Sequence, residues 1–112
     1  MRRPALTRRL TLETRERLPD GAGGFVESWA ATGALWAEIR PGSGRAAAGP
    51  GGPLSLARHR IVLRAAPQAA PSRPRPGQRL RDGARLFLIR AVTEADPAGR
   101  YLILWADEET AQ

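Results

Sequence analysis

The sequence predicts an all-β fold, a small single-domain β-barrel or sandwich of about six to seven short antiparallel strands with one long loop. Three observations support this class. Apolar and polar residues alternate in several runs, as they do in strands that bury one face. Turns rich in Gly and Pro separate these runs at roughly ten-residue spacing, which is typical of small barrels and sandwiches. A chain of 112 residues also fits one domain, spanning residues 1–112, with a single modest core.

The N-terminal part contains the first strands and a turn. Residues 6–16 alternate between apolar and polar side chains, which indicates a half-buried strand. Residues 18–24 are rich in Gly and contain a Pro and an Asp, so the chain turns there. We expect a short strand at 25–29 and another at 34–40. Pro41 ends the latter because proline has no N–H for the ladder.

A stretch of Gly, Ala and Pro follows at residues 42–57. It cannot bury enough apolar surface to order itself, and a loop of this length in a compact domain is usually functional or disordered. A Gly-rich segment with sparse positive charge can reach into a pore and touch phosphates without reading bases. The segment is therefore a candidate DNA-gating loop, with a plain surface loop as the alternative. Its candidate residues are Gly42, Ser43, Gly44, Arg45 and Arg58.

The C-terminal half predicts three further strands, at residues 58–64, 86–93 and 101–106. Residues 66–77 hold four prolines, so we expect an extended, polyproline-like linker. Asp82-Gly83 predicts a tight hairpin with a type I′ turn. The one helix candidate is short and lies at residues 53–59.

Charge is unevenly distributed along the chain. The net charge is +7, and every basic residue is Arg. Arg40 to Arg90 contains eleven arginines and one acid, Asp82, whereas the C-terminal end carries Asp107, Glu108 and Glu109. This pattern suits a chain that lies near nucleic acid, or copies that meet in a ring with the basic middle of one facing the acidic end of the next. Solvated surface charge is the simpler alternative.

Several chemistries are disfavoured by composition. The absence of Cys excludes disulfides, thiolate metal sites and cysteine nucleophiles, and a single His59 disfavours a histidine-based metal or catalytic site. No phosphate-binding loop is present, and no apolar run is long enough to span a bilayer. We therefore expect no enzyme, no cofactor, no metal and no membrane partner.

The aromatic residues allow two interpretations. Trp29, Trp36 and Trp105 could stack on nucleic-acid bases, but we favour anchors in the core or an interface. For a buried Trp36, replacement by Ala is expected to cost roughly 3–5 kcal/mol. The full set of candidate anchors is Trp29, Trp36, Ile61, Phe87, Ile89, Tyr101 and Trp105.

Short motifs in a fixed order cover nearly the whole chain. Residues 36–44 read W-A-x-I-x-P-x-x-G, residues 59–64 read H-x-I-x-x-R, and residues 77–108 carry a D-G turn followed by apolar strands and a terminal acid. This order resembles the head–tail joining proteins of tailed phages, also called head-completion or stopper proteins, which have relatives in gene transfer agents. Arg45 departs from the family pattern, which often has an acid there.

The resemblance implies a β-barrel protomer in a homo-oligomeric ring, with a hexamer favoured, in the neck of a phage-like particle. Portal or adaptor proteins would lie on the head side, and a tail terminator or tail tube on the tail side. The ring would close the DNA exit after packaging and then let double-stranded DNA pass. Assembly would take place in the bacterial cytoplasm. A tail-terminator-type ring protein and a small nucleic-acid-binding β-barrel are the alternatives.

Overall fold

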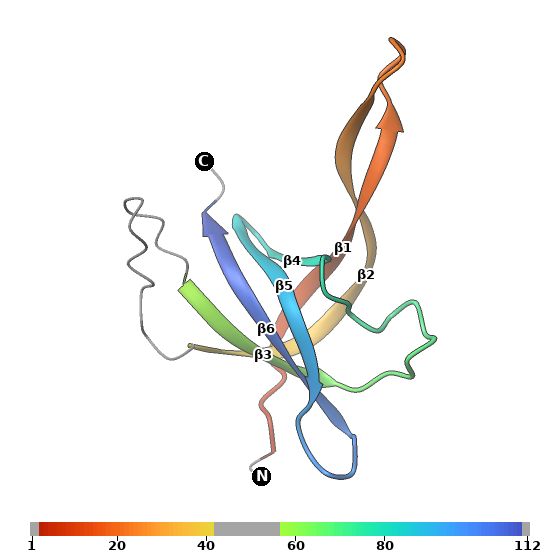
Figure 1. Cartoon of the computed structure of the whole chain (residues 1–112). Helices are drawn as coiled ribbons and strands as arrows, with labels where there is room; N and C mark the ends of the chain where they lie inside the picture. Colours follow the sequence, from red (N-terminus) through yellow and green to blue (C-terminus); the bar gives the residue numbers. More distant parts are fainter. Residues whose placement is uncertain (1–2, 42–56, 111–112) are drawn as a thin grey trace, which may run out of the picture.

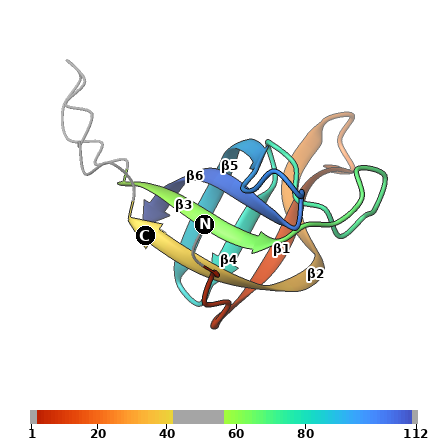
Figure 2. The same cartoon turned by 90° about the horizontal axis from the view of Figure 1, so that it is seen from below.

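The computed structural model describes residues 3–41 and 57–110. In these ranges six antiparallel strands form a closed barrel in the order β1-β2-β3-β6-β5-β4 (Figures 1 and 2). The predicted all-β class is confirmed. The strands are β1 (Arg8–Pro19), β2 (Phe25–Pro41), β3 (Ala57–Arg64), β4 (Arg79–Asp82), β5 (Arg85–Glu94) and β6 (Tyr101–Thr110).

The helix candidate at 53–59 is wrong for residues 57–59, which begin β3, and its remainder lies outside the described residues. These three residues pair with β6 from the first position of β3, so the sheet ladder takes their backbone hydrogen bonds. The described ranges hold no helix that could cross a membrane.

The core lies inside the barrel. It consists of side chains from every second position of the strands, as the alternation predicts. Phe87 is its largest member and is fully buried. The remaining buried members are smaller, which lets them interdigitate around that ring. They are Leu10, Leu12, Ala37, Ile61, Leu63, Leu80, Ile89, Leu102, Leu104 and Ala106.

Strands β1 and β2 continue beyond the barrel as a two-stranded arm, residues 14–30, visible at the upper right of Figure 1. The predicted strands at 25–29 and 34–40 are one continuous strand, because β2 runs unbroken over 17 residues. A bulge between Leu12 and Glu13 shifts the register where the arm leaves the barrel. Such bulges bend and twist a strand, which turns the arm away from the barrel wall.

The β4–β5 hairpin turns one residue later than the Asp-Gly sequence predicted, and with another turn type. Asp82 pairs with Arg85, so Gly83 and Ala84 are the two central residues of the turn. Gly83 has a φ of 60°, and no residue other than glycine among the described ones has a positive φ. A positive φ at the first central position alone is the type II′ pattern, so the type I′ prediction is wrong.

The Pro-rich segment 66–77 is folded rather than extended. Its backbone closes successive turns: the amide of Ala70 donates to the carbonyl of Pro67, and the amide of Arg73 donates to that of Ala70. Pro74 is fully buried, and Arg73 Nη1 donates to the carbonyl of Ala66 over 3.0 Å. Side-chain tethers and one buried proline therefore override the polyproline tendency of the composition.

Candidate functional site

The candidate gating loop leaves the barrel at the end of β2 and returns at the start of β3. Gly42, Ser43, Gly44 and Arg45 lie outside the described residues, so their predicted role stays a prediction. The roots of the loop are neighbours, because Pro41 pairs with His59 across the β2–β3 ladder. The described part of the site is therefore the barrel rim where β2 ends and β3 begins.

Arg58 stands on this rim and shares a carboxylate with Arg90. Arg58 Nε donates to Asp107 Oδ1 over 3.3 Å, and Arg90 Nε donates to Asp107 Oδ2 over 2.9 Å. The Asp107 side chain is only 4% exposed, whereas those of Arg58 and Arg90 are 61% and 55% exposed. Two solvent-facing guanidiniums thus share one buried negative charge, which leaves this part of the rim with a net positive charge.

Glu108 joins β6 to β3 and β5 on the same rim. It accepts two hydrogen bonds from Arg85, of 2.7 and 3.1 Å, and lies 3.4 Å from His59 Nε2. The bonds from Arg85 hold the pKa of Glu108 below its usual range despite burial, with a smaller contribution from His59. The same pairing raises the pKa of Arg85. Glu108 is therefore anionic at neutral pH.

These contacts change the interpretation of the acidic C-terminal end. Asp107 and Glu108 bind arginines of their own chain, because β6 lies between β3 and β5 in the sheet. They are not left to face the basic middle of another copy, as the charge pattern suggested. Glu109 is exposed.

The candidate anchors separate into three environments. Ile61, Phe87 and Ile89 lie in the core. Tyr101 and Trp105 are half-buried on the outer face of β6, where the guanidiniums of β3 lie about 6 Å from their ring centroids, 6.0 Å for Arg64 over Tyr101 and 5.9 Å for Arg60 over Trp105.

The other two tryptophans lie on β2. Trp29 is half-buried at the root of the arm, between Arg15 and Arg79. Trp36 is 57% exposed on the outer face, so the expected 3–5 kcal/mol for its replacement by Ala is wrong. Alternation predicts that the side chains of Trp36 and Ala37 point to opposite faces of β2. The structure buries the face that carries Ala37.

Sequence reasoning missed a cluster at the point where the barrel closes. Glu13 is 8% exposed and accepts hydrogen bonds from Arg79 Nε over 2.5 Å and Arg81 Nε over 3.1 Å. Burial by itself would raise the pKa of Glu13, but the two arginines outweigh it and hold the pKa below its usual range. Alternation correctly puts Glu13 on the polar, outer face of β1, because its neighbour Leu12 pairs with the core residue Leu80. The cluster was missed because Arg79 and Arg81 lie 66 and 68 positions away in the sequence.

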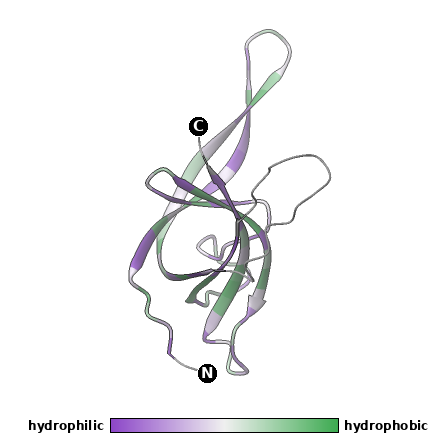
Figure 3. Ribbon diagram, turned by 90° about the vertical axis from the view of Figure 1, so that its left-hand side faces the viewer, coloured by the Kyte–Doolittle hydropathy of each residue, from purple (hydrophilic) through white to green (hydrophobic). Residues whose placement is uncertain are grey.

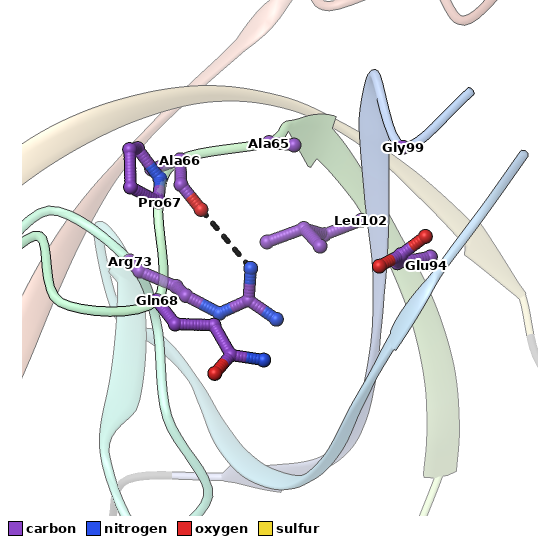
Figure 4. A pocket seen from close by; sticks show the side chains of 8 residues that line it. All are labelled: Ala65, Ala66, Pro67, Gln68, Arg73, Glu94, Gly99 and Leu102. Atoms are coloured by element: carbon purple, nitrogen blue, oxygen red, sulfur yellow. Dashed lines mark hydrogen bonds between the residues drawn. The ribbon is translucent and has the colours of Figure 1, made fainter.

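A pocket of about 390 Å³ lies between the Pro-rich segment and the β5–β6 connection (Figure 4). Arg73 and Glu94 carry its charge, and Arg73 is already bonded to the Ala66 carbonyl. No three His, Cys, Asp or Glu side chains gather to hold a metal ion in the part of the chain that the structure describes. The pocket therefore offers two opposite charges and no acid–base or metal-binding cluster.

Comparison with known proteins adds the family. Residues 1–109 match the family model described as phage head completion protein. A chain of a structure described as the virion of a native gene transfer agent particle is 49% identical, with a TM-score of 0.77, and the match covers 97% of this chain and 100% of that one. Protein SF1141 from Shigella flexneri 2a is 22% identical with a TM-score of 0.70 over 100% of both chains, which shows the shared fold. Comparison with curated proteins gives no match. The chain belongs to the phage head completion protein family and is a structural head–tail joining protein.

Proposed function

We propose that copies of this chain form a closed ring in the neck of a phage-like particle, around the channel through which DNA leaves the head. The ring, with six copies favoured, contacts portal or adaptor proteins on the head side and a tail terminator or tail tube on the tail side. Its role is structural and not enzymatic, and it is assembled in the bacterial cytoplasm. The observation that carries the proposal is the family match over residues 1–109, together with a 49% identical chain in a gene transfer agent virion.

The rim charges support contact with sliding DNA. Arg58 and Arg90 are more than half exposed, so each guanidinium can reach a phosphate. Asp107 neutralises part of their charge. Because phosphate contacts dominate the affinity for duplex DNA, a fully charged arginine cluster would hold the duplex in place. Partial neutralisation keeps the contacts weak and independent of sequence, which passage through a channel requires.

We further propose that the 42–57 loop closes the channel, with the rim as its base. Deleting residues 46–52 should leave the barrel folded, because the six strands lie outside the deleted segment. Particles carrying the deletion should contain the chain but lose packaged DNA. DNA retention is measured by nuclease protection, and incorporation of the chain by immunoblotting of purified particles. Particles that hold both chain and DNA at wild-type levels would contradict the plug role.

A matched pair of substitutions tests the rim itself. Arg58→Ala removes a guanidinium beside the loop, whereas Arg100→Ala removes an exposed one in the β5–β6 connection. We expect Arg58→Ala to alter the rate of DNA release from purified particles and Arg100→Ala to leave it unchanged. Equal rates for both variants and the wild type would count against DNA contact at the rim.

One observation favours a second candidate, binding of single-stranded nucleic acid. Trp36 lies on the outer face of β2, Tyr101 and Trp105 lie on that of β6, and Arg60 and Arg64 lie on β3 between these strands. Accessible aromatic rings beside arginines can stack on bases. This candidate predicts tight, salt-sensitive binding of a single-stranded oligonucleotide by the isolated chain. The neck protein should bind such an oligonucleotide poorly.

A further inference from the structure

The arm ends in exposed apolar side chains, which we call the tip patch: Leu18, Phe25 and Val26. These side chains are 44%, 60% and 50% exposed. Leu18 pairs directly with Val26 on one face of the ribbon, and Phe25 pairs with Pro19 on the other face, where the Arg17 guanidinium lies 4.7 Å from the Phe25 ring centroid. Figure 3 shows hydrophobic colour near the end of the otherwise mixed arm. Both faces of the tip therefore expose apolar side chains, which marks the end of the arm as a contact surface.

An apolar groove lies at the opposite end of the same two strands. It encloses about 230 Å³ and contains the most exposed tryptophan, Trp36. Large aromatics in such exposed positions are typical anchors of protein interfaces. The groove is lined by Leu6, Ala34, Leu35, Trp36, Leu63 and Arg64, and Arg64 is its only charged residue.

The tip patch and the groove of one chain cannot meet. Trp36 pairs with Arg9 near the start of β1, whereas Phe25 pairs with Pro19 at its end. Ten residues of extended strand separate the two pairs, about 33 Å at roughly 3.3 Å per residue. The arm also leads away from the end of the barrel where the N-terminus lies (Figure 1). A contact between the two surfaces must therefore join two molecules.

The root of the arm holds it in a defined direction. Arg79 of β4 binds Glu13 and places its guanidinium 4.2 Å from the ring centroid of Trp29 in the arm. Gln78 Nε2 adds a hydrogen bond of 2.8 Å to Thr14 Oγ1. These contacts tie the arm to β4, the strand that closes the barrel. An arm that is already oriented loses less entropy when it docks.

We propose that the tip patch of one copy docks into the Trp36 groove of a second copy of this chain, so that each copy gives one arm and receives another. Charge favours this partner, because the arm carries three acids, Glu16, Asp20 and Glu27, against two arginines, whereas the groove is lined by Arg64 with Arg9 next to it. Backbone N–H groups of Ala22 and Gly24 bind the Asp20 carboxylate and hold its pKa below its usual range.

A contact between two different surfaces of identical chains is head-to-tail, and it closes into a ring when its rotation permits. The inference thus deepens the proposed ring and rests on it. The tip patch is small compared with the roughly 800 Å² per partner of a stable interface, so each contact is weak alone and gains strength from closure of the ring.

Cross-linking tests the contact directly, because the chain has no native cysteine. Chains carrying Ala22→Cys, in the exposed turn beside the tip patch, are mixed with chains carrying Ala34→Cys, which lines the groove, so that both anchors are kept. The mixture is treated with a short bis-maleimide reagent, and we expect a linked product between the two variants in large excess over either variant linked to itself. The matched control pairs Ala34→Cys with Ser72→Cys, an exposed residue of the Pro-rich segment. Equal yields from the test and control pairs would overturn the proposal.

Complementation supplies a second readout. Phe25→Asp destroys the tip patch but keeps the groove, and Trp36→Asp does the reverse. Each variant alone should self-associate at least about tenfold more weakly than the wild type in sedimentation experiments, as expected for loss of an interface anchor. Their mixture retains one intact contact per pair and cannot close a ring, so it should form at most a one-to-one dimer and nothing larger. Ala98→Asp, on an exposed turn, should behave as the wild type does. Single variants that associate as strongly as the wild type, or a mixture that assembles beyond a dimer, would refute docking.

Cross-linking in purified particles distinguishes failure of the arm contact from failure of the proposed function. A chain with both Ala22→Cys and Ala34→Cys should yield a ladder of linked copies in the particle. If the chain is absent from the neck, the proposed function fails. If the neck contains a ring but the chain gives no ladder, or links to another protein instead, only the arm contact fails.

Discussion

The cluster around Glu13 provides the sharpest test of how this barrel closes. Only three residue pairs join β1 to β4, and Glu13–Arg79 is one of them. Glu13→Gln keeps the size of the side chain but removes the charge that both arginines bind. The side chain of Arg79 is 14% exposed and that of Arg81 is 39% exposed. Their two hydrogen bonds therefore do not contribute equally to stability.

The expected loss follows from these exposures. A hydrogen bond to a charged group contributes about 1.5–3 kcal/mol when it is buried, which applies to Arg79. The more exposed Arg81 bond is screened by solvent and contributes about 0.5–1 kcal/mol. Glu13→Gln should thus lower the free energy of unfolding by about 2–4 kcal/mol. At roughly 4 °C per kcal/mol for a domain of this size, the Tm should fall by about 8–16 °C.

Thermal unfolding followed by circular dichroism at several pH values measures the effect. Glu13 has a lowered pKa in the folded state, so its contribution is present above the pKa of the unfolded chain, about 4.3, and is lost as the pH falls through the folded value. The difference between wild type and Glu13→Gln should therefore shrink in acid. Glu16→Gln is the control, because Glu16 is exposed on the same strand. Similar Tm values for both variants, or a difference unchanged in acid, would refute the reasoning.

Three further outcomes are expected. Phe87→Ala should lower the free energy of unfolding by about 3–5 kcal/mol in urea titrations, because Phe87 is fully buried, and an equal loss for the exposed Phe25→Ala would contradict the core assignment. Gly83→Ala should cost about 1–2 kcal/mol because φ is 60° there, whereas Gly33→Ala, with open space and no positive φ, should be close to neutral; matching losses would rule out the type II′ turn. Glu108→Gln should weaken the fall in stability as the pH drops below about 4.3, since the pKa of Glu108 is lowered, and an unchanged acid slope would show that its pairing with Arg85 is unimportant.

Local sequence patterns predicted most of the strands correctly, because strand and turn conformations depend largely on neighbouring residues. Alternation located the barrel parts of β1 and β2 and all but the first residue of β3, and the Asp-Gly sequence located the β4–β5 hairpin within one residue. The errors have physical causes as well. The Pro-rich segment folds because Pro74 is buried and Arg73 is tethered, and both interactions depend on distant parts of the chain.

The candidate site was less predictable. The rim residue Arg58 was identified from its place beside the Gly-rich loop, but its partner Asp107 lies 49 positions away. The arm was not predicted, although its part of β1 no longer alternates: residues 15–17 are all charged and exposed. The strand pairing distinguishes the arm from the wall, because β1 pairs with β4 only at residues 11–13 and β2 pairs with β3 only at residues 37–41.

By itself, the sequence determined an all-β chain, the positions of its turns and the residues able to share one face, since the backbone geometry of strands and turns depends on near neighbours. The tertiary structure decided which face met the core, and so left Trp36 outside while burying Ala37. It also decided that β6 lies between β3 and β5, where Asp107 and Glu108 form ion pairs with arginines of the same chain. Both outcomes depend on which strands pair across long stretches of chain, and that choice reflects the packing of the whole barrel.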